Sequence, residues 1–242
     1  MIKPAFKCNE WKKYTYPSII NQFPDDYQNL TYVEACVGSG AVFLNKKPSV
    51  EEIINDIDPT IVAIWKCLRD RSKDFINQVC SSKVSEELFN TLKTKENTNN
   101  FDLGVSDYLI RKMSKNEAKQ EFVKKITKPS KENLLSISSR LNNTIILKQN
   151  MVEIIQLWNN SNVFIYIDPP IMPGSRVKET DSLEIEMTTD DHVDYLHKIK
   201  DTKAKVLISS HPNNVYNKHL KSWKCTKIET ADKKVECLWS NY

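Results

Sequence analysis

The sequence predicts an α/β fold with a mostly parallel sheet, an inserted helical lobe and an antiparallel closing hairpin. Three observations support this prediction. Short apolar runs alternate with helical patterns in the first seventy residues and again after residue 143, as in chains built from βαβ units. The run 163–167 is apolar throughout, which is typical of a central strand buried on both faces. Between residues 72 and 135, strand patterns vanish and Lys, Asn, Glu and Ser dominate, which indicates helices outside the sheet.

The expected elements follow one another along the chain. Strands are expected up to Ala35, up to Asp56, over 144–147, 163–167 and 206–208, and in a closing hairpin of 223–229 and 234–239. Helices are expected directly after the turn 38–40, over 60–69 behind the N-cap Asp58 and Pro59, over 86–92, and after the capping pair Thr188 and Asp191. Residues 1–71 and 136–242 would form the sheet domain, and 72–135 the helical lobe.

A glycine turn follows the first expected strand. Two of the four glycines of the chain lie in Gly38-Ser39-Gly40, where a ligand can approach the backbone closely and meet its amide groups. No third glycine completes a dinucleotide fingerprint. Asp56, at the end of the next strand, is the type of residue that binds ribose hydroxyls. The pair predicts a nucleoside-cofactor site, and a generic βαβ unit with a glycine turn is the alternative interpretation.

The motif Asp168-Pro169-Pro170-Ile171 follows the buried run 163–167. Two prolines end a strand because neither can donate a hydrogen bond to the ladder. Asp168 therefore lies at the carboxyl edge of the sheet, where open α/β folds bind ligands. Its carboxylate and the rigid Pro169 carbonyl can both accept hydrogen bonds from an amine. Taken alone, the motif favours an ordinary strand-ending turn, and the functional interpretation gains its weight from the glycine turn upstream.

Together these segments resemble the D12 class of adenine-N6 DNA methyltransferases, the Dam-type family, over nearly the whole chain. The resemblance is carried by residues 2–6, Lys12, 34–43, 54–58, 138–141, the motif at 168–171 and the closing segment 235–242. It implies a Rossmann-like methyltransferase sheet, S-adenosyl-L-methionine as the cofactor, and transfer of its methyl group to a flipped adenine of double-stranded DNA. It also implies that the inserted lobe recognises DNA. No metal is needed for this reaction.

The resemblance also implies the residues of the site. The catalytic residues would be Asp168, Pro169, Pro170 and Ile171. The cofactor-binding residues would be Lys12, Glu34, Ala35, Cys36, Val37, Gly38, Ser39, Gly40, Asp56, Asn150 and Asp168. Asp168 and the Pro169 carbonyl would orient the adenine amine in line with the methyl group and stabilise its developing positive charge.

The chain departs from the family pattern at ligand-contacting positions. It has Ile171 where Tyr is usual, Ala35-Cys36 for Pro-Phe, Glu10-Trp11 for Gly-Gly, and Asn150-Met151 for Asp-Phe. Loss of the aromatic ring at 171 removes a stacking interaction of about 1–3 kcal/mol for an extruded base. Three functions therefore remain open. They are an active DNA methyltransferase, either orphan or in a restriction–modification or phage system; a catalytically degenerate member acting as a DNA-binding or partner subunit of an active methyltransferase; and a methyltransferase acting on RNA or another amine. We favour the first, because Gly38, Gly40, Asp56 and Asp168 are all kept.

Charge is unevenly distributed along the chain. The overall net charge is only +4, but residues 111–131 contain eight Lys or Arg against two Glu, a local net charge of +6. Such a run is usually a solvated helical face. Next to the family resemblance, phosphate contact is the better interpretation. The expected DNA-binding residues are Arg111, Lys112, Lys115, Lys119, Lys124 and Lys125.

The resemblance implies a bacterial or phage-encoded protein, and the remaining composition favours the cytoplasm. No apolar run approaches the roughly 18 residues of a membrane span, so no membrane contact is expected. The six cysteines are scattered and contain no Cys-x-x-Cys pair, which favours free thiols in a reducing compartment over a zinc site.

Overall fold

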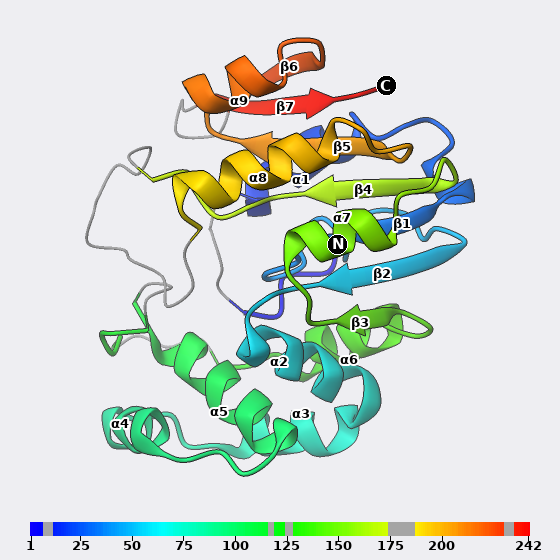
Figure 1. The fold of residues 1–242 in the computed structure, drawn as a ribbon. Coiled ribbons are helices and arrows are strands. Elements are labelled where there is room, and N and C mark those ends of the chain that lie inside the picture. Colours follow the sequence, from blue (N-terminus) through cyan, green and yellow to red (C-terminus); the bar gives the residue numbers. More distant parts are fainter. Residues whose placement is uncertain (7–11, 116–118, 124–127, 174–186, 230–234) are drawn as a thin grey trace.

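The computed structural model describes residues 1–6, 12–115, 119–123, 128–173, 187–229 and 235–242 (Figure 1). Within these residues, seven strands form one sheet in the order β3-β2-β1-β4-β5-β7-β6. The strands are β1 (Thr31–Glu34), β2 (Glu51–Asn55), β3 (Ile145–Leu147), β4 (Val163–Ile167), β5 (Lys205–Ser210), β6 (Lys224–Glu229) and β7 (Val235–Ser240). The first five are parallel, and β7 is antiparallel to both β5 and β6. The mostly parallel sheet with an antiparallel closing hairpin is thus confirmed.

The parallel register brings the ends of the central strands to one edge. Glu34, the last residue of β1, pairs with Ile54 of β2 and Tyr166 of β4. Ile167 at the end of β4 pairs with Ile208 of β5. The segments that follow β1, β2 and β4 therefore leave the sheet side by side. This edge carries the glycine turn, Asp56 and Asp168.

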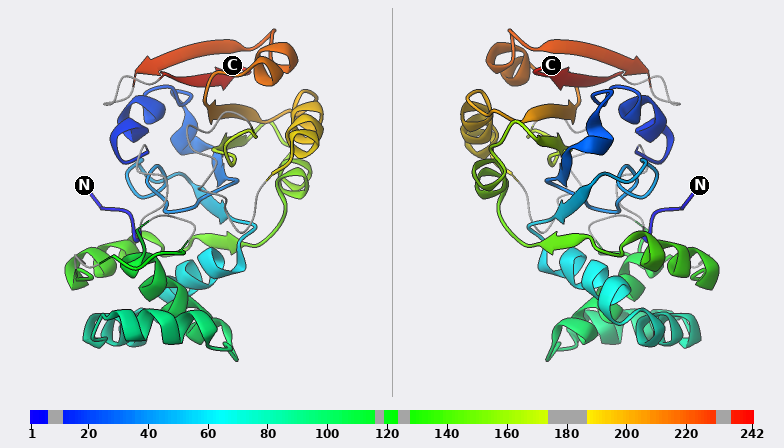
Figure 2. Two further views of the ribbon diagram at one scale, coloured as in Figure 1. Left: turned by 90° about the vertical axis from the view of Figure 1, so that its left-hand side faces the viewer. Right: turned by 90° about the vertical axis from the view of Figure 1, so that its right-hand side faces the viewer.

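Helices cover both faces of the sheet (Figure 2). The helices are α1 (Lys12–Ile20), α2 (Pro59–Asp70), α3 (Ser72–Ser81), α4 (Glu86–Thr94), α5 (Asn100–Met113), α6 (Lys131–Arg140), α7 (Met151–Leu157), α8 (Thr189–Ile199) and α9 (Asn214–His219), with a 3-10 turn, η1, at Tyr27–Asn29. Helices α7, α8 and α9 pack on one face and α1 on the other, and the core on the α1 side continues into α2, α3, α5 and α6. Helices α3, α4 and α5 lie beyond the β3 edge of the sheet (Figure 1). Side chains alternate between the two cores, so that Tyr32 faces the layer that contains α1 and Val33 faces the layer that contains α7.

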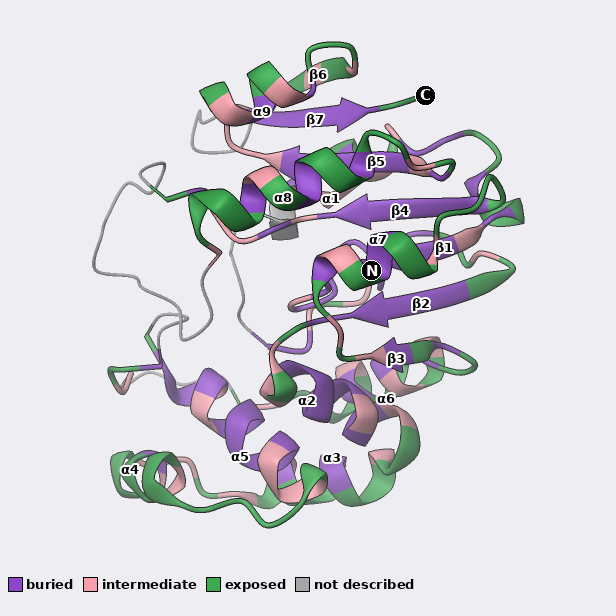
Figure 3. Ribbon diagram, viewed as in Figure 1, coloured by how far each residue is buried: buried purple, intermediate pink, exposed green. Residues whose placement is uncertain are grey.

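Burial is greatest in the centre of the sheet (Figure 3). Every residue of β4 is buried, as predicted for a strand covered on both faces. The edge strand β6 instead alternates between exposed and half-buried residues. None of the helices in the described residues is long and apolar enough to cross a membrane.

Local sequence accounts for most helix starts. The Asp58 side chain accepts from the Thr60 amide with Pro59 as the first residue of α2, and Thr188 with Asp191 forms a capping box at α8. The prediction of a helix directly after Gly40 is wrong, because residues 41–46 form a series of turns. The segment is short, and Pro48 disfavours helical backbone at the residue before it.

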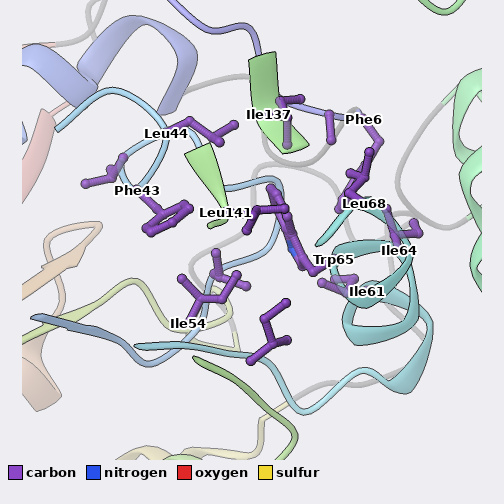
Figure 4. Close-up of a cluster of buried hydrophobic side chains, with 14 of the residues drawn as sticks. Phe6, Phe43, Leu44, Ile54, Ile61, Ile64, Trp65, Leu68, Ile137 and Leu141 are labelled. Atoms are coloured by element: carbon purple, nitrogen blue, oxygen red, sulfur yellow. The ribbon is translucent and has the colours of Figure 1, made fainter. Parts of the chain in front are cut away.

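The helical insertion shares one core with the sheet. A Cβ on Gly104 of α5 would lie 2.8 Å from Cys67 Sγ and 3.0 Å from the Ala63 carbonyl oxygen of α2, so the two helices touch backbone to backbone. Figure 4 shows the neighbouring part of this core, where side chains from the amino-terminal segment, α2 and α6 surround Trp65. Helix α6 runs across the expected boundary at 135 and 136.

Candidate active site

The glycine turn is held by hydrogen bonds from two elements. Gly38 and Gly40 have φ angles of 47° and 70°, a region that favours glycine. Trp65 Nε1 of α2 donates to the Gly38 carbonyl at 3.0 Å. A Cβ on Gly40 would lie only 2.7 Å from the Trp65 ring, so close packing and backbone conformation both require glycine there. The turn therefore presents its backbone to the edge of the sheet in one fixed conformation.

Asp56 contacts this turn directly. Its Oδ2 accepts from the Gly38 amide at 2.9 Å, and its Oδ1 accepts from the Asp58 amide at 3.0 Å. Burial raises the pKa of Asp56 to about 6, although both amide hydrogen bonds and the charge of Arg111 act in the opposite direction. Each carboxylate oxygen can accept a second hydrogen bond, which leaves capacity for ribose hydroxyls.

Asn55 connects three strand ends and was missed by the sequence analysis. Its Nδ2 donates to the carbonyls of Ala35 and Gln149 at 2.9 Å each, and its Oδ1 accepts from the Gln149 amide at 2.9 Å. Asn55 is 1% exposed, so the fully bonded amide fixes the loops after β1 and β3 around the end of β2. The signal was present in the sequence as an amide side chain ending an apolar strand.

Asp168 is oriented by a residue on the neighbouring strand. Ser209 Oγ of β5 donates to Asp168 Oδ1 at 3.0 Å. Because Ser209 uses its proton for this bond, the Tyr166 hydroxyl, 2.8 Å from Ser209 Oγ, is the donor in the other contact. Tyr166 and Ser209 are buried and Asp168 is half-buried. The chain of hydrogen bonds therefore runs from the core outward and ends on the carboxylate at the edge.

Glu34 lies beneath this edge. The Tyr32 hydroxyl donates to Glu34 Oε2 at 2.5 Å. Burial, with a further contribution from Asp168, raises the pKa of Glu34 to about 8, although the bond from Tyr32 lowers it. Glu34 is therefore mainly protonated at neutral pH. Its neutral carboxyl can donate and accept hydrogen bonds, and it places no second full negative charge beside Asp168.

Two departures from the family pattern meet at the same edge. Cys36 Sγ lies 4.0 Å from Met151 Sδ, so the residues found where the family usually has two Phe contact each other. Burial raises the pKa of the Cys36 thiol, and the carboxylates of Asp56, Asp168 and Glu34 raise it further. The thiol is therefore a packing group at neutral pH rather than a nucleophile.

The other expected site residues are placed as follows. Asn150 caps α7, where it forms a capping box with Glu153. Ala35, Val37 and Ser39 are buried along the turn, and Val37 donates its amide to the Asn55 carbonyl at 2.8 Å. Pro169 is buried, and Pro170 and Ile171 are half-buried. Lys12 begins α1, but its side chain lies outside the described part of the structure.

The donors and acceptors at this edge fit a nucleoside cofactor. In the part of the chain that the structure describes, Gln149 Oε1 is buried and has no hydrogen-bond partner, so the loop after β3 carries an unused acceptor. Asp56 supplies acceptors for a ribose, whereas the amides of Val37, Gly38 and Gly40 are already donated within the protein. No group of three or more His, Cys, Asp or Glu in the described residues could hold a metal ion.

The residues that were expected to bind DNA differ in their exposure. Arg111 and Lys119 are buried, and both pair with Asp107 in the insertion. Lys112 is half-buried, and Lys115 is exposed and pairs with Glu121 at 3.0 Å. Lys124 and Lys125 lie outside the described residues. Arg111 and Lys119 therefore neutralise a buried carboxylate, and the surface part of the run is smaller than expected.

Comparisons with known proteins identify relatives of the chain. Residues 12–236 match the family model of the D12 class N6 adenine-specific DNA methyltransferases. No curated protein sequence matches. The rRNA methyltransferase aviRa from Streptomyces viridochromogenes has a similar structure, with a TM-score of 0.44, 10% sequence identity and coverage of 93% of this chain and 81% of that chain. A protein of Pyrococcus horikoshii assigned as an RNA methyltransferase, PH1948, has a TM-score of 0.42, 12% identity and coverage of 99% and 89%.

The family match extends over most of the chain, from α1 into β7. It includes every strand whose end builds the edge described above. The chain therefore belongs to the D12 class of N6 adenine-specific DNA methyltransferases.

Proposed function

We propose that this protein transfers the methyl group of S-adenosyl-L-methionine to the N6 amine of an adenine flipped out of double-stranded DNA. One observation carries the proposal. Ser209 holds Asp168 at the same edge of the sheet as the Gly38 turn and Asp56. The proposed amine acceptor would thus lie beside the proposed nucleoside site.

In this proposal, some residues of the edge bind the cofactor and others orient the adenine amine. Asp56 would accept from the ribose, and Gln149 would contact another part of the cofactor. The cofactor, when bound, supplies a methyl group on a sulfonium, whose carbon–sulfur bond breaks as the new carbon–nitrogen bond forms. Asp168 and the Pro169 carbonyl accept hydrogen bonds from the amine, direct its lone pair at the methyl carbon and stabilise the positive charge on nitrogen.

The test separates binding from transfer. Wild-type protein should bind S-adenosyl-L-methionine in calorimetry and transfer labelled methyl groups to adenine-containing duplex DNA. Asp168→Ala should abolish transfer and leave the cofactor Kd unchanged, because the carboxylate acts on the amine. Asp201→Ala, an exposed aspartate after α8, is the matched control and should retain wild-type transfer. No cofactor binding at millimolar concentration, or full activity of Asp168→Ala, would reject the proposal.

A degenerate member that acts as a DNA-binding or partner subunit is the second candidate. It is favoured by Ile171 in place of the stacking aromatic and by the contact of Cys36 with Met151. If the chain is active, Ile171→Tyr should raise the transfer rate about tenfold, since recovery of about 1.4 kcal/mol in the transition state gives that factor. Ile171→Leu is the control and should leave the rate unchanged. Absence of transfer by the purified chain, without rescue by Ile171→Tyr, would support the partner role instead.

A further inference from the structure

A cluster of buried charges connects the helical insertion to the segment that carries Asp56. Arg111 of α5 is 6% exposed, and its Nε donates to Asp107 Oδ2 at 2.5 Å. Its Nη2 donates to Asp58 Oδ2 at 3.0 Å and to Thr60 Oγ1 at 3.2 Å. One guanidinium thus bridges a helix of the insertion and the N-terminus of α2, which begins directly after the loop that contains Asp56 (Figure 1).

From Asp58 the contacts continue to the glycine turn. The Asp58 amide donates to Asp56 Oδ1 at 3.0 Å, and Asp56 Oδ2 accepts from the Gly38 amide at 2.9 Å. The Asp58 side chain is fixed on its other oxygen by Thr60, whose amide lies 2.8 Å and whose hydroxyl lies 2.7 Å from Oδ1. Only Asp58 and Asp56 therefore separate Arg111 from the turn.

The insertion holds Arg111 firmly in this place. Lys119 Nζ donates to Asp107 Oδ1 at 3.0 Å, so Asp107 has a cation on each oxygen. Burial alone would raise the pKa of Asp107, but Arg111 and Lys119 outweigh it and lower the pKa. Lys119 has a φ of 55°, a backbone conformation that non-glycine residues seldom adopt. The guanidinium also lies 5.2 Å from the centre of the Phe6 ring.

We propose that Arg111 is a positioning residue for the cofactor site, and that the helical insertion sets cofactor affinity through its contact with Asp58. The inference rests on the proposed function, in which Asp56 binds the cofactor ribose. A planar guanidinium reaches Asp107 and Asp58 at the same time, which a lysine ammonium cannot do in this geometry. By linkage, a ligand that moves α5 changes cofactor affinity, and the cofactor changes that ligand's affinity by the same factor.

The first measurement is the Kd of S-adenosyl-L-methionine for the full chain by calorimetry. Arg111→Met should weaken binding by about tenfold, within the usual range of coupling between sites. Arg111→Lys should bind more tightly than Arg111→Met but more weakly than wild type, because it keeps the positive charge but cannot bond Asp107 and Asp58 at the same time. Arg71→Met removes an exposed arginine that directly precedes the insertion, pairs with Asp74 and lies over the Phe101 ring, and it should bind with wild-type affinity.

The pH dependence of binding separates positioning from general stability. Cofactor affinity should fall as pH decreases through about 6, where Asp56 becomes protonated. The charged groups that act on Asp56 are Asp58 and Arg111, and the Cys36 thiol is nearby. Removal of the guanidinium disfavours the ionised form of Asp56. The pH midpoint of the change in cofactor affinity should therefore move to a higher value in Arg111→Met. An unchanged midpoint would indicate a purely structural role.

One further variant and a cofactor-free measurement keep the outcomes distinct. Asp58→Asn weakens the same contact between Arg111 and Asp58 and should also weaken cofactor binding. It therefore tests the proposal even if Arg111→Met folds poorly. Hydrogen exchange at the Gly38 amide, measured without cofactor, should be faster in both variants than in wild type or Arg71→Met. If wild type binds no cofactor but this exchange difference is found, positioning stands and the proposed function fails. If wild type binds and the folded variants match its affinity, midpoint and exchange, the positioning role is overturned.

Discussion

Ser209 illustrates how a single residue on a neighbouring strand fixes the carboxylate that we propose as the acceptor for the amine. Its hydroxyl relays the hydrogen bond from Tyr166 to Asp168, so that the carboxylate is held before an amine arrives. A hydrogen bond to a charged group contributes about 1.5–3 kcal/mol. Ser209→Ala should therefore lower kcat by about tenfold or more, with the cofactor Kd unchanged. Steady-state methyl transfer with calorimetry checks this. Ser222→Ala, an exposed serine, should have no effect, and an unaltered kcat in Ser209→Ala would contradict the assignment.

Individual residues could be predicted where their chemistry is local. Asp168 directly follows β4 and Gly38 comes four residues after the end of β1, so the sequence places each near a strand end without knowledge of its neighbours. Asn55 and Ser209 act through partners that lie 94 and 41 residues away, which the sequence alone does not bring together. Arg111 was expected on a DNA-facing surface. It is buried instead, because Asp107 one helical turn earlier neutralises it.

At the scale of elements, β2 and α6 are joined by a buried ion cluster centred on Glu52. Arg140 Nη2 donates to Glu52 Oε1 at 2.8 Å and to the Phe43 carbonyl at 3.1 Å, and Lys46 contacts the same carboxylate. Glu52→Gln should destabilise the fold by about 3 kcal/mol, because two cations are left without their partner. Glu51→Gln is exposed on the same strand and should stay within about 0.5 kcal/mol of wild type in urea unfolding.

The effect of Glu52 should also depend on pH. Burial acts to raise its pKa, but Arg140 and Lys46 lower it below the ordinary 4.5. A carboxyl with a lowered pKa in the fold stabilises fully above its unfolded value and loses that stabilisation as pH falls through the folded value. The stability gap between wild type and Glu52→Gln should therefore be largest above pH 4.5 and shrink at more acidic pH. A gap that stays constant down to acidic pH would contradict this account.

Elements with a strong pattern were predicted well, and those set by packing were not. The apolar run of β4 and the capping signals of α2 and α8 are encoded within a few residues of each element. The apolar segment after Gly40 has the composition of a helix but too little length before Pro48. Its side chains are buried in turns instead, since the core rather than the backbone pattern determines their place.

For the whole molecule, the distribution of basic residues determines how DNA binding should respond to salt. Replacing Lys115, Lys124 and Lys125 together by Gln should weaken binding to all DNA sequences. It should also flatten the plot of log affinity against log salt by about 0.9 for each phosphate that the variant no longer neutralises. Lys119→Gln should lower the melting temperature with little change in this slope, because Lys119 is buried against Asp107. Filter binding between low and moderate salt checks both, and an unchanged slope in the triple variant would assign the run to solvation.

The close approach of Gly104 to α2 has a consequence for how such enzymes diversify. A recognition module that can be exchanged freely needs a junction of its own, but here the insertion and the sheet domain are built around the same helix. A chimaera that transplants residues 72–130 alone would leave the recipient with a helix shaped for a different neighbour. If the insertion recognises DNA, as the family resemblance implies, new target specificity is expected to arise by substitutions on its outer surface. Wholesale exchange would have to carry α2 along with it.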